Sequence, residues 1–352
     1  MVKEYLPEDW ADKCRELGAL KRGRGIKTPE ELLTLNLLYL TEGESLQMTS
    51  ALMKLAGIEV NKNAVHERIK KSWKWLEWMA KKALQENGFL AEKPEWLKDK
   101  EVCLVDGSEL ALKGSKGGDY ILHYMFSLFE FSCRQCELTT TKEGERLGIF
   151  EIKQGDIVIA DRNYGNMKAI EYVKEKDAEF VLRLKSSCFN IYNEEGNKID
   201  ILENGKDLDE WESKVINCCY KQGKELKPLK VCLMKKGKEE IEKSSKKMAR
   251  DAKRTQRKTS QRSTLSNDYI VLATNLSYTP EQIFELYRTR WQIELVFKRL
   301  KTLFGFGNVP SKNPDSVKAW FYGKLLLAGI CEESIKRSHF PPSPNSKGGK
   351  RS

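Results

Sequence analysis

Two aspartates stand at the ends of short apolar runs in the middle of the sequence. The run Glu101–Asp106 (EVCLVD) ends at Asp106, and the run Asp156–Asp161 (DIVIAD) ends at Asp161. Runs of this length rich in Val and Ile predict buried β-strands. Two carboxylates at the ends of neighbouring strands can bind a divalent cation through hard oxygen ligands. Capping of the following turn is the simpler alternative for either aspartate alone.

A third acidic residue lies on a helix predicted further along the chain. The string Thr279-Pro280-Glu281-Gln282 supplies an N-cap, a first-turn proline and a capping-box glutamine, and predicts a helix that continues through Leu300 or further. At about 100° per residue, four polar residues share a face about 60° wide: Tyr287, Arg290, Glu294 and Lys301. The face is either a salt-bridged surface, because Arg290 and Glu294 are an i,i+4 pair, or an acid for metal flanked by cations for phosphate.

The spacing of these four residues resembles a known signature. Tyr287-x2-Arg290-x3-Glu294-x6-Lys301 matches the Y-R-E-K motif of IS4-family DDE transposases at every interval, and the surrounding string YRTRWQIELVFKRLK is similar throughout. Val105–Ser108 (VDGS) and Ala160–Gly165 (ADRNYG) also resemble that family. The resemblance covers residues 30 to 335, and a motif together with two matching strand ends in the right order is a specific signal.

The resemblance implies an enzyme that cuts and joins DNA strands at the ends of an insertion sequence. It assigns the catalytic and metal-binding triad to Asp106, Asp161 and Glu294, with Mg²⁺ as cofactor and Mn²⁺ as a substitute. Two such ions activate the attacking oxygen and stabilise the leaving oxygen. Cut-and-paste transposition through a hairpin intermediate is implied as well. The expected partner is double-stranded DNA, both terminal inverted repeats and target, bound by a homodimer.

Five residues are predicted to contact DNA or its phosphates: Tyr287, Arg290, Lys301, Arg162 and Trp291. Arginine suits bidentate phosphate contact, and lysine acts as a compact charge. Trp291 projects about 40° from Tyr287 around the helix, so a core position and a DNA-facing position both stay open for it. Relatives use an aromatic residue in the insertion to hold a flipped base, and Trp211 is a candidate without a firm alignment. Glu145, in the string KEGERL, is interpreted as structural.

The elements before the first aspartate read as helices. Apolar spacing predicts helices at Glu30–Leu40, Leu46–Ala56 and Asn63–Leu84, with a turn at Gly57. Residues 1–98 are therefore predicted to be an all-α DNA-binding region, in which a helix-turn-helix would present Lys62, Arg68, Lys70 and Lys71. An ordinary helical bundle is the alternative.

The remaining pattern predicts an α/β fold with a mixed sheet flanked by helices, which the resemblance makes RNase H-like. Residues 99–184 and 268–336 form its two parts, with strands at Ile121–Phe129, Cys133–Thr140, Glu179–Leu184 and Asp268–Thr274 and helices at Gly165–Lys176 and Asp315–Lys336. Residues 185–267 are predicted as a β-rich insertion with strands at Phe189–Tyr192, Ser213–Tyr220 and Leu229–Met234, ending in the basic stretch Lys235–Arg262. Residues 337–352 are predicted to be a disordered tail.

Composition favours a polyanionic partner. The chain has 62 Lys and Arg against 51 Asp and Glu, a net charge of +11, which favours nucleic acid over membrane. No apolar run is long enough for a membrane span, and the N-terminus lacks the apolar segment of a signal peptide. We therefore expect a cytoplasmic, nucleoid-associated protein with no membrane partner, whose nine cysteines are reduced thiols.

Two other functions compete with an active transposase. Family members usually continue beyond the last predicted helix, so a truncated copy that binds DNA without cutting it, or that inhibits transposition, is the alternative. An RNase H-like nuclease unrelated to mobile DNA is a third possibility. It gives no reason for the insertion or for the four-residue face of the helix.

Overall fold

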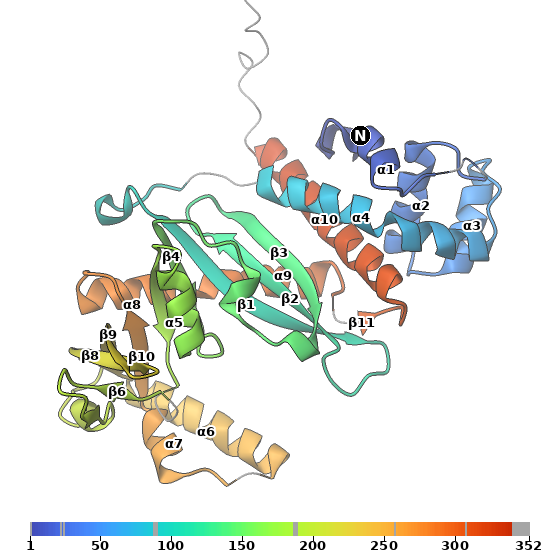
Figure 1. Ribbon diagram of the computed structural model, residues 1–352. Helices are drawn as coiled ribbons and strands as arrows, with labels where there is room; N and C mark the ends of the chain where they lie inside the picture. The colour runs from blue at the N-terminus through green and yellow to red at the C-terminus, as the bar shows by residue number, and fades with distance from the viewer. Residues whose placement is uncertain are drawn as a thin grey trace, which may run out of the picture.

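The computed structural model describes residues 2–21, 23, 25–86, 91–185, 189–256, 258–306 and 308–339 of the 352-residue chain. Figure 1 shows helices of the N-terminal region at one end, a large sheet in the middle and a projecting helix pair at the other end. Within these residues no helix is both long and apolar enough to cross a membrane. Most of the tail predicted for residues 337–352 lies outside the described residues, and residues 337–339 are helical rather than irregular.

Helices form most of the first hundred residues, as predicted. They are η1 (Val2–Tyr5), α1 (Trp10–Glu16), α2 (Pro29–Thr41), α3 (Leu46–Leu55), α4 (Lys62–Glu86) and η2 (Glu95–Leu97). A capping box between Thr28 and Glu31 fixes the start of α2. Gly57, at φ 78°, follows the end of α3. The long helix α10 (Pro314–His339) packs along α4, so the end of the described chain joins the N-terminal helices (Figure 1).

A single mixed sheet organises the rest of the chain, which confirms the predicted mixed sheet with flanking helices. Its strands are β1 (Glu101–Leu112), β2 (Tyr120–Ser127), β3 (Ser132–Thr140), β4 (Asp156–Ala160), β5 (Glu179–Arg183), β6 (Ile191–Tyr192), β7 (Lys198–Ile199), β8 (Ser213–Gln222), β9 (Glu225–Lys235), β10 (Tyr269–Thr274) and β11 (Asn308–Val309). They lie in the order β3-β2-β1-β4-β5-β10-β9-β8-β6-β7, and β11 pairs with β1. The central strands β1, β4 and β5 run parallel, and β2 and β10 flank them antiparallel.

Helices cover both faces of the central strands. In β1, Val102 and Leu104 belong to the core beneath α8 (Pro280–Arg288) and α9 (Trp291–Leu303). The alternate residues Cys103 and Val105 belong to the second core, beneath α5 (Met167–Lys174). Figure 1 shows α5 in front of the sheet and α8 and α9 behind it. Because successive side chains of a strand point to opposite faces, the even-numbered residues 102 and 104 lie in one core and the odd-numbered residues 103 and 105 lie in the other.

The segment after β5 continues the same sheet. Strand β9 pairs with β10 from Lys235 to Lys230, and β8 pairs with β9 as a long hairpin. The basic stretch forms α6 (Lys238–Thr255), which has no buried residue, followed by α7 (Gln261–Ser266). The β-rich segment is therefore hydrogen-bonded to the central strands, and the domain boundaries predicted at residues 185 and 267 stay predictions.

Two predicted elements have the wrong length. Strand β1 does not end at Asp106 but continues to Leu112, because β2 pairs with it as far as Leu110. The helix predicted from Thr279 through Leu300 is broken into α8 and α9 by a turn at residues 289–290. The capping box of Thr279 and Gln282 is present as predicted.

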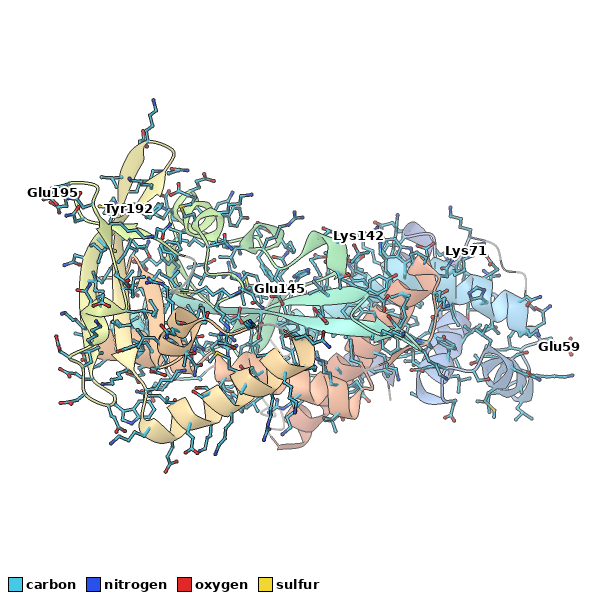
Figure 2. The ribbon with its side chains drawn as sticks, turned by 90° about the horizontal axis from the view of Figure 1, so that it is seen from below. Glu59, Lys71, Lys142, Glu145, Tyr192 and Glu195 are labelled. Atoms are coloured by element: carbon cyan, nitrogen blue, oxygen red, sulfur yellow. The ribbon has the colours of Figure 1, made fainter. Side chains whose placement is uncertain are left out.

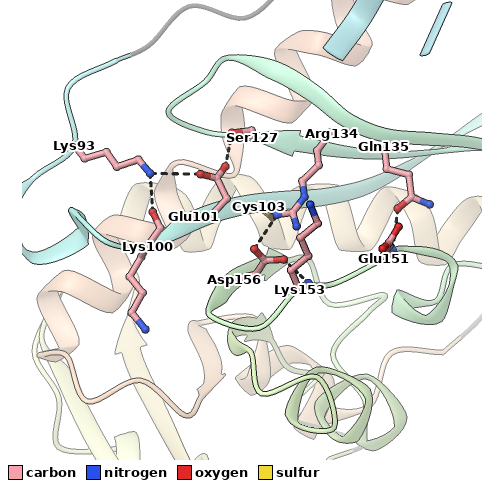
Figure 3. A network of polar contacts seen from close by, with 10 residues as sticks. All are labelled: Lys93, Lys100, Glu101, Cys103, Ser127, Arg134, Gln135, Glu151, Lys153 and Asp156. Carbon is pink, nitrogen blue, oxygen red and sulfur yellow. Dashed lines mark hydrogen bonds and ion pairs between the residues drawn. The ribbon is translucent and has the colours of Figure 1, made fainter. Parts of the chain in front are cut away.

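A buried polar network holds the beginnings of β1 and β4 (Figure 3). Asp156, at the first position of β4, is 3 % exposed and binds Arg134 at 2.8 Å. Its second oxygen accepts a hydrogen bond from the backbone N–H of Lys153 at 2.7 Å. Arg134 also donates to the Cys103 sulfur at 2.9 Å. Asp156 is therefore a fully partnered structural acid, unlike the aspartate that follows the other end of β4.

Gly165 closes the loop after β4 against the end of β5. A Cβ at this position would collide with the carbonyl oxygen of Arg183 and lie 2.9 Å from its carbonyl carbon. Backbone atoms of a paired strand cannot move away cheaply. This contact therefore fixes the loop that carries Asp161.

We expect Gly165→Ala to lower the free energy of unfolding by about 3 kcal/mol, the cost of overpacking a site that cannot relax. Urea denaturation measures the change. Gly148→Ala is the matched control, because a Cβ there meets no atom within 4 Å, and it should change stability by less than about 0.5 kcal/mol. Equal stability of the two variants would contradict the role assigned to this contact.

Candidate active site

The register of β1 and β4 places two aspartates side by side. The parallel pairing ends at Val105↔Ala160, so the next positions along the two strands are Asp106 and Asp161. Both continue the set of residues that faces α9, since Leu104 and Ile159 point to that core. Neighbouring strands lie about 4.8 Å apart. Two carboxylates therefore come close together where β4 has ended and β1 continues.

The negative charge of the buried Asp106 carboxylate is only partly balanced by its neighbours. One carboxylate oxygen accepts a hydrogen bond from the Gly107 N–H at 2.8 Å, and the other faces an Arg290 Nη at 3.3 Å. Burial, followed by the negative charge of Asp161, raises the pKa of Asp106 to about 7 despite these two interactions. The fold thus holds a carboxylate where its ionised form lacks sufficient counter-charge.

The turn between α8 and α9 places Arg290 where its side chain reaches Asp106 on β1. Arg290 stands immediately before α9, in the turn, and its side chain is 17 % exposed. One nitrogen of its guanidinium binds Asp106, and another binds Glu294, four residues further along α9. Glu294 and Asp106 are thus held on the two sides of a single guanidinium group.

The other residues of the Y-R-E-K face differ in exposure. Tyr287 is 8 % exposed, and its hydroxyl has no hydrogen-bond partner among the described residues. The Arg290 guanidinium lies 5.9 Å from the Tyr287 ring centroid. Lys301 is exposed on α9, and Trp291 is 58 % exposed, which excludes the core position for Trp291, while its contact with DNA stays a prediction.

The oxygen donors fit a divalent cation, although the three acids do not surround one position. In the described part of the chain no group of three His, Cys, Asp or Glu is gathered closely enough to hold an ion. Arg290 lies between Glu294 and Asp106 and supplies the positive charge there. Carboxylate oxygens are the ligands that Mg²⁺ and Mn²⁺ prefer. The deficit of positive charge at Asp106 and Asp161 is what a bound cation would correct.

Glu145 also reaches this site, a position that sequence reasoning interpreted as structural. It lies on the loop between β3 and β4, after η3 (Thr141–Glu143) and before η4 (Leu147–Ile149). Its carboxylate accepts a hydrogen bond from Asn163, two residues after Asp161, at 2.8 Å. No local pattern predicts this contact, because it depends on how the loop folds back over the sheet.

An open cleft of about 600 Å³ begins beside Glu145. Three cations line it together with the loop after Asp161: Arg162, Lys185 and Lys221. Arg162, predicted to contact phosphate, is exposed there. The cleft therefore extends from Glu145 along a basic surface.

We expect Asp106→Asn to stabilise the metal-free protein, and to do so more at high pH. The pKa of Asp106 is raised in the folded state, so its ionisation costs stability increasingly as the pH rises from about 4 to about 7. The gain in free energy of unfolding should be greater at pH 8 than at pH 5, by on the order of 1 kcal/mol. Urea denaturation in the presence of a chelator at both pH values measures this gain.

Asp251→Asn, on exposed α6, is the control. A pH-independent gain for Asp106→Asn would refute this account.

Comparison with known proteins relates this chain to transposases. A model of the family described as "Transposase DDE domain" matches residues 98–330. The chain is 27 % identical over 347 residues, 96 % of this chain and 93 % of the relative, to the putative transposase InsL for insertion sequence element IS186A of Escherichia coli K12. The transposase for IS421 of Escherichia coli is likewise 27 % identical over 348 residues, with the same coverage of both chains. The transposase for IS231F of Bacillus thuringiensis subsp. israelensis is 25 % identical over 203 residues, 52 % of this chain and 42 % of the relative. The chain therefore belongs to the DDE-domain family of insertion-sequence transposases, as the IS4-like motif predicts.

Proposed function

We propose that this transposase cuts and joins DNA strands at its element's ends with Mg²⁺, or Mn²⁺ as a substitute, held by Asp106, Asp161 and Glu294. The observation that carries the proposal is the register that places Asp106 beside Asp161, with Glu294 linked to the same point through Arg290. A carboxylate cluster of this kind at the end of buried strands has no structural use that a neutral residue would not serve better.

Divalent ions, when bound, would supply charge neutralisation and activation of the attacking oxygen. The protein's own residues have separate tasks. Asp106, Asp161 and Glu294 would hold the cations through their carboxylate oxygens. Arg290 now neutralises two carboxylates. Its planar guanidinium would turn to a phosphate of the DNA once cations take over that charge.

The path of the DNA follows the exposed residues around the site. Lys301, Trp291 and Arg162 are exposed, and the cleft with Lys185 and Lys221 continues from Arg162. Tyr287 is buried, so we propose that its unpartnered hydroxyl supports Arg290 or meets the DNA backbone only after Arg290 moves. The basic helix α6 and the N-terminal helices extend the surface available to DNA.

The finer features of the reaction also remain proposals. We propose an RNase H-like core that performs cut-and-paste transposition through a hairpin intermediate. We further propose a homodimer on terminal inverted repeats, in the cytoplasm at the nucleoid. Support comes from the family resemblance of the Y-R-E-K face and from the parallel strands that carry the two aspartates.

We expect Asp106→Asn, Asp161→Asn and Glu294→Gln each to abolish strand cleavage of DNA that carries the element's ends. These changes keep the side-chain shape but remove the charge that holds the cation, so DNA binding should survive. Gel analysis of end-labelled DNA with Mg²⁺ or Mn²⁺ measures cleavage, and fluorescence anisotropy measures binding.

Glu285→Gln is the control for these three variants, because Glu285 is an exposed carboxylate on α8. It should cleave as the wild type does. Wild-type protein that binds the ends tightly but never nicks them with either metal would sink the proposal. That result would favour a protein that only binds DNA.

We expect Lys301→Ala to weaken DNA binding and to reduce the slope of log affinity against log salt by about 1, the signature of one lost phosphate contact. Titrations at several salt concentrations measure the slope. Lys224→Ala, on an exposed residue in the turn between β8 and β9, serves as the control and should leave the slope unchanged. A slope that Lys301→Ala leaves unaltered would remove Lys301 from the DNA interface.

A further inference from the structure

Glu145, on the loop between β3 and β4, lies against the strand that carries the first aspartate. A Cβ at Gly107, the residue after Asp106, would collide with the Glu145 Oε1 atom and lie 3.0 Å from the carbons of the same side chain. Glycine at 107 is therefore what allows this carboxylate to rest on β1. Figure 2 places Glu145 in the middle of the molecule, away from the ends where Glu59 and Glu195 lie.

Glu145 approaches the aspartates from the side opposite to Arg290. Asp106 points to the face covered by α9, whereas position 107 faces the other core, beneath α5. Arg290 and Glu294 thus border the two aspartates on one side, and Glu145 borders them on the other. The negative charge of Glu145 acts on Asp106, and that of Asp161 acts on Glu145.

The carboxylate of Glu145 lacks a cationic partner. Its hydrogen-bond donor is the neutral amide of Asn163, and it forms no ion pair with any described residue. A structural glutamate that is half buried would be expected to pair with a base, as Asp156 pairs with Arg134. Glu145 instead lies near the negative charges of Asp161 and Glu109.

A second group points to a ligand at the same position. Tyr164 is completely buried, and its hydroxyl has no hydrogen-bond partner in the described part of the chain. The charged groups that act on this hydroxyl are Glu145, Asp106 and Asp161. Buried hydroxyl groups are almost always hydrogen-bonded in native proteins, so an unpartnered one close to these carboxylates points to a ligand or its water as the partner.

We propose that Glu145 is a fourth carboxylate of the divalent-cation site, and that the Tyr164 hydroxyl gains its hydrogen-bond partner when that site is loaded. The inference rests on the proposed metal-dependent function and adds two residues to it. Glu145 would hold the cation or its water from the α5 side, facing Glu294 on the α9 side. Asn163 would act as a positioning residue, because it fixes the carboxylate that accepts its amide hydrogen bond.

The first test measures Mn²⁺ binding to the full chain by electron paramagnetic resonance, without any DNA cleavage. Glu145→Gln should weaken Mn²⁺ binding at least about tenfold, the loss typical of groups that support metal ligands. Glu143→Gln is the matched control, since Glu143 lies on the same loop but is exposed and pairs with Arg146 at 3.3 Å. Its affinity should equal that of the wild type.

The variant Asp106→Asn distinguishes the proposed metal site from the proposed role of Glu145 in that site. Lost binding in Asp106→Asn with unchanged binding in Glu145→Gln would leave the proposed metal site standing and overturn the role of Glu145. Wild-type protein that binds no Mn²⁺ would overturn both.

The second test uses Tyr164→Phe, which removes only the hydroxyl. Without metal this variant should unfold at the same temperature as the wild type or higher, because an unpartnered buried hydroxyl is costly. With saturating Mn²⁺ for the wild type, the increase in melting temperature should be smaller in the variant, since a weaker ligand stabilises less. A variant that is destabilised without metal, or that gains as much from Mn²⁺ as the wild type, would contradict the inference.

Discussion

The parallel pairing of β1 with β4 is the constraint on which the site depends. Because the parallel pairing ends at Val105 and Ala160, the next residues on the two strands, Asp106 and Asp161, lie side by side where β4 has ended and β1 continues to Leu112. Like charges at this separation repel, and burial raises the cost of ionising Asp106. A fold selected for stability alone would place a neutral pair there.

The rest of the sheet keeps these strands in register against that repulsion. At the other end of β4, Asp156 and Arg134 form a buried, fully hydrogen-bonded pair, which fixes the start of the strand (Figure 3). The repelling carboxylates lie at the opposite end of the strand. Alternating side chains of β1 fill two separate cores, and a slip of one residue would exchange them. Gly165 then ties the loop after Asp161 to the backbone of Arg183.

Local signals in the sequence predict the strands and the helix starts well, and they miss what depends on contacts distant in the chain. The apolar runs before Asp106 and Asp161 and the capping box at Thr279 needed only neighbouring residues. The turn at Thr289–Arg290 contains neither glycine nor proline, so a projection around one straight helix could not reveal it. The contact of Glu145 with Gly107 could not be predicted from the sequence either, because the two residues meet only after two strands and a loop have folded.

The charges at the site suggest the order in which its ligands must arrive. Asp106 and Asp161 stand at the strand ends, Glu294 and Glu145 border them on either side, and Arg290 pairs with Asp106 and with Glu294. A DNA phosphate approaching this position would be repelled by the net negative charge. Under the proposed function, cation binding must therefore precede or accompany entry of the scissile phosphate. Cation binding would also free Arg290, which pairs with two carboxylates, to bind a phosphate of the DNA instead.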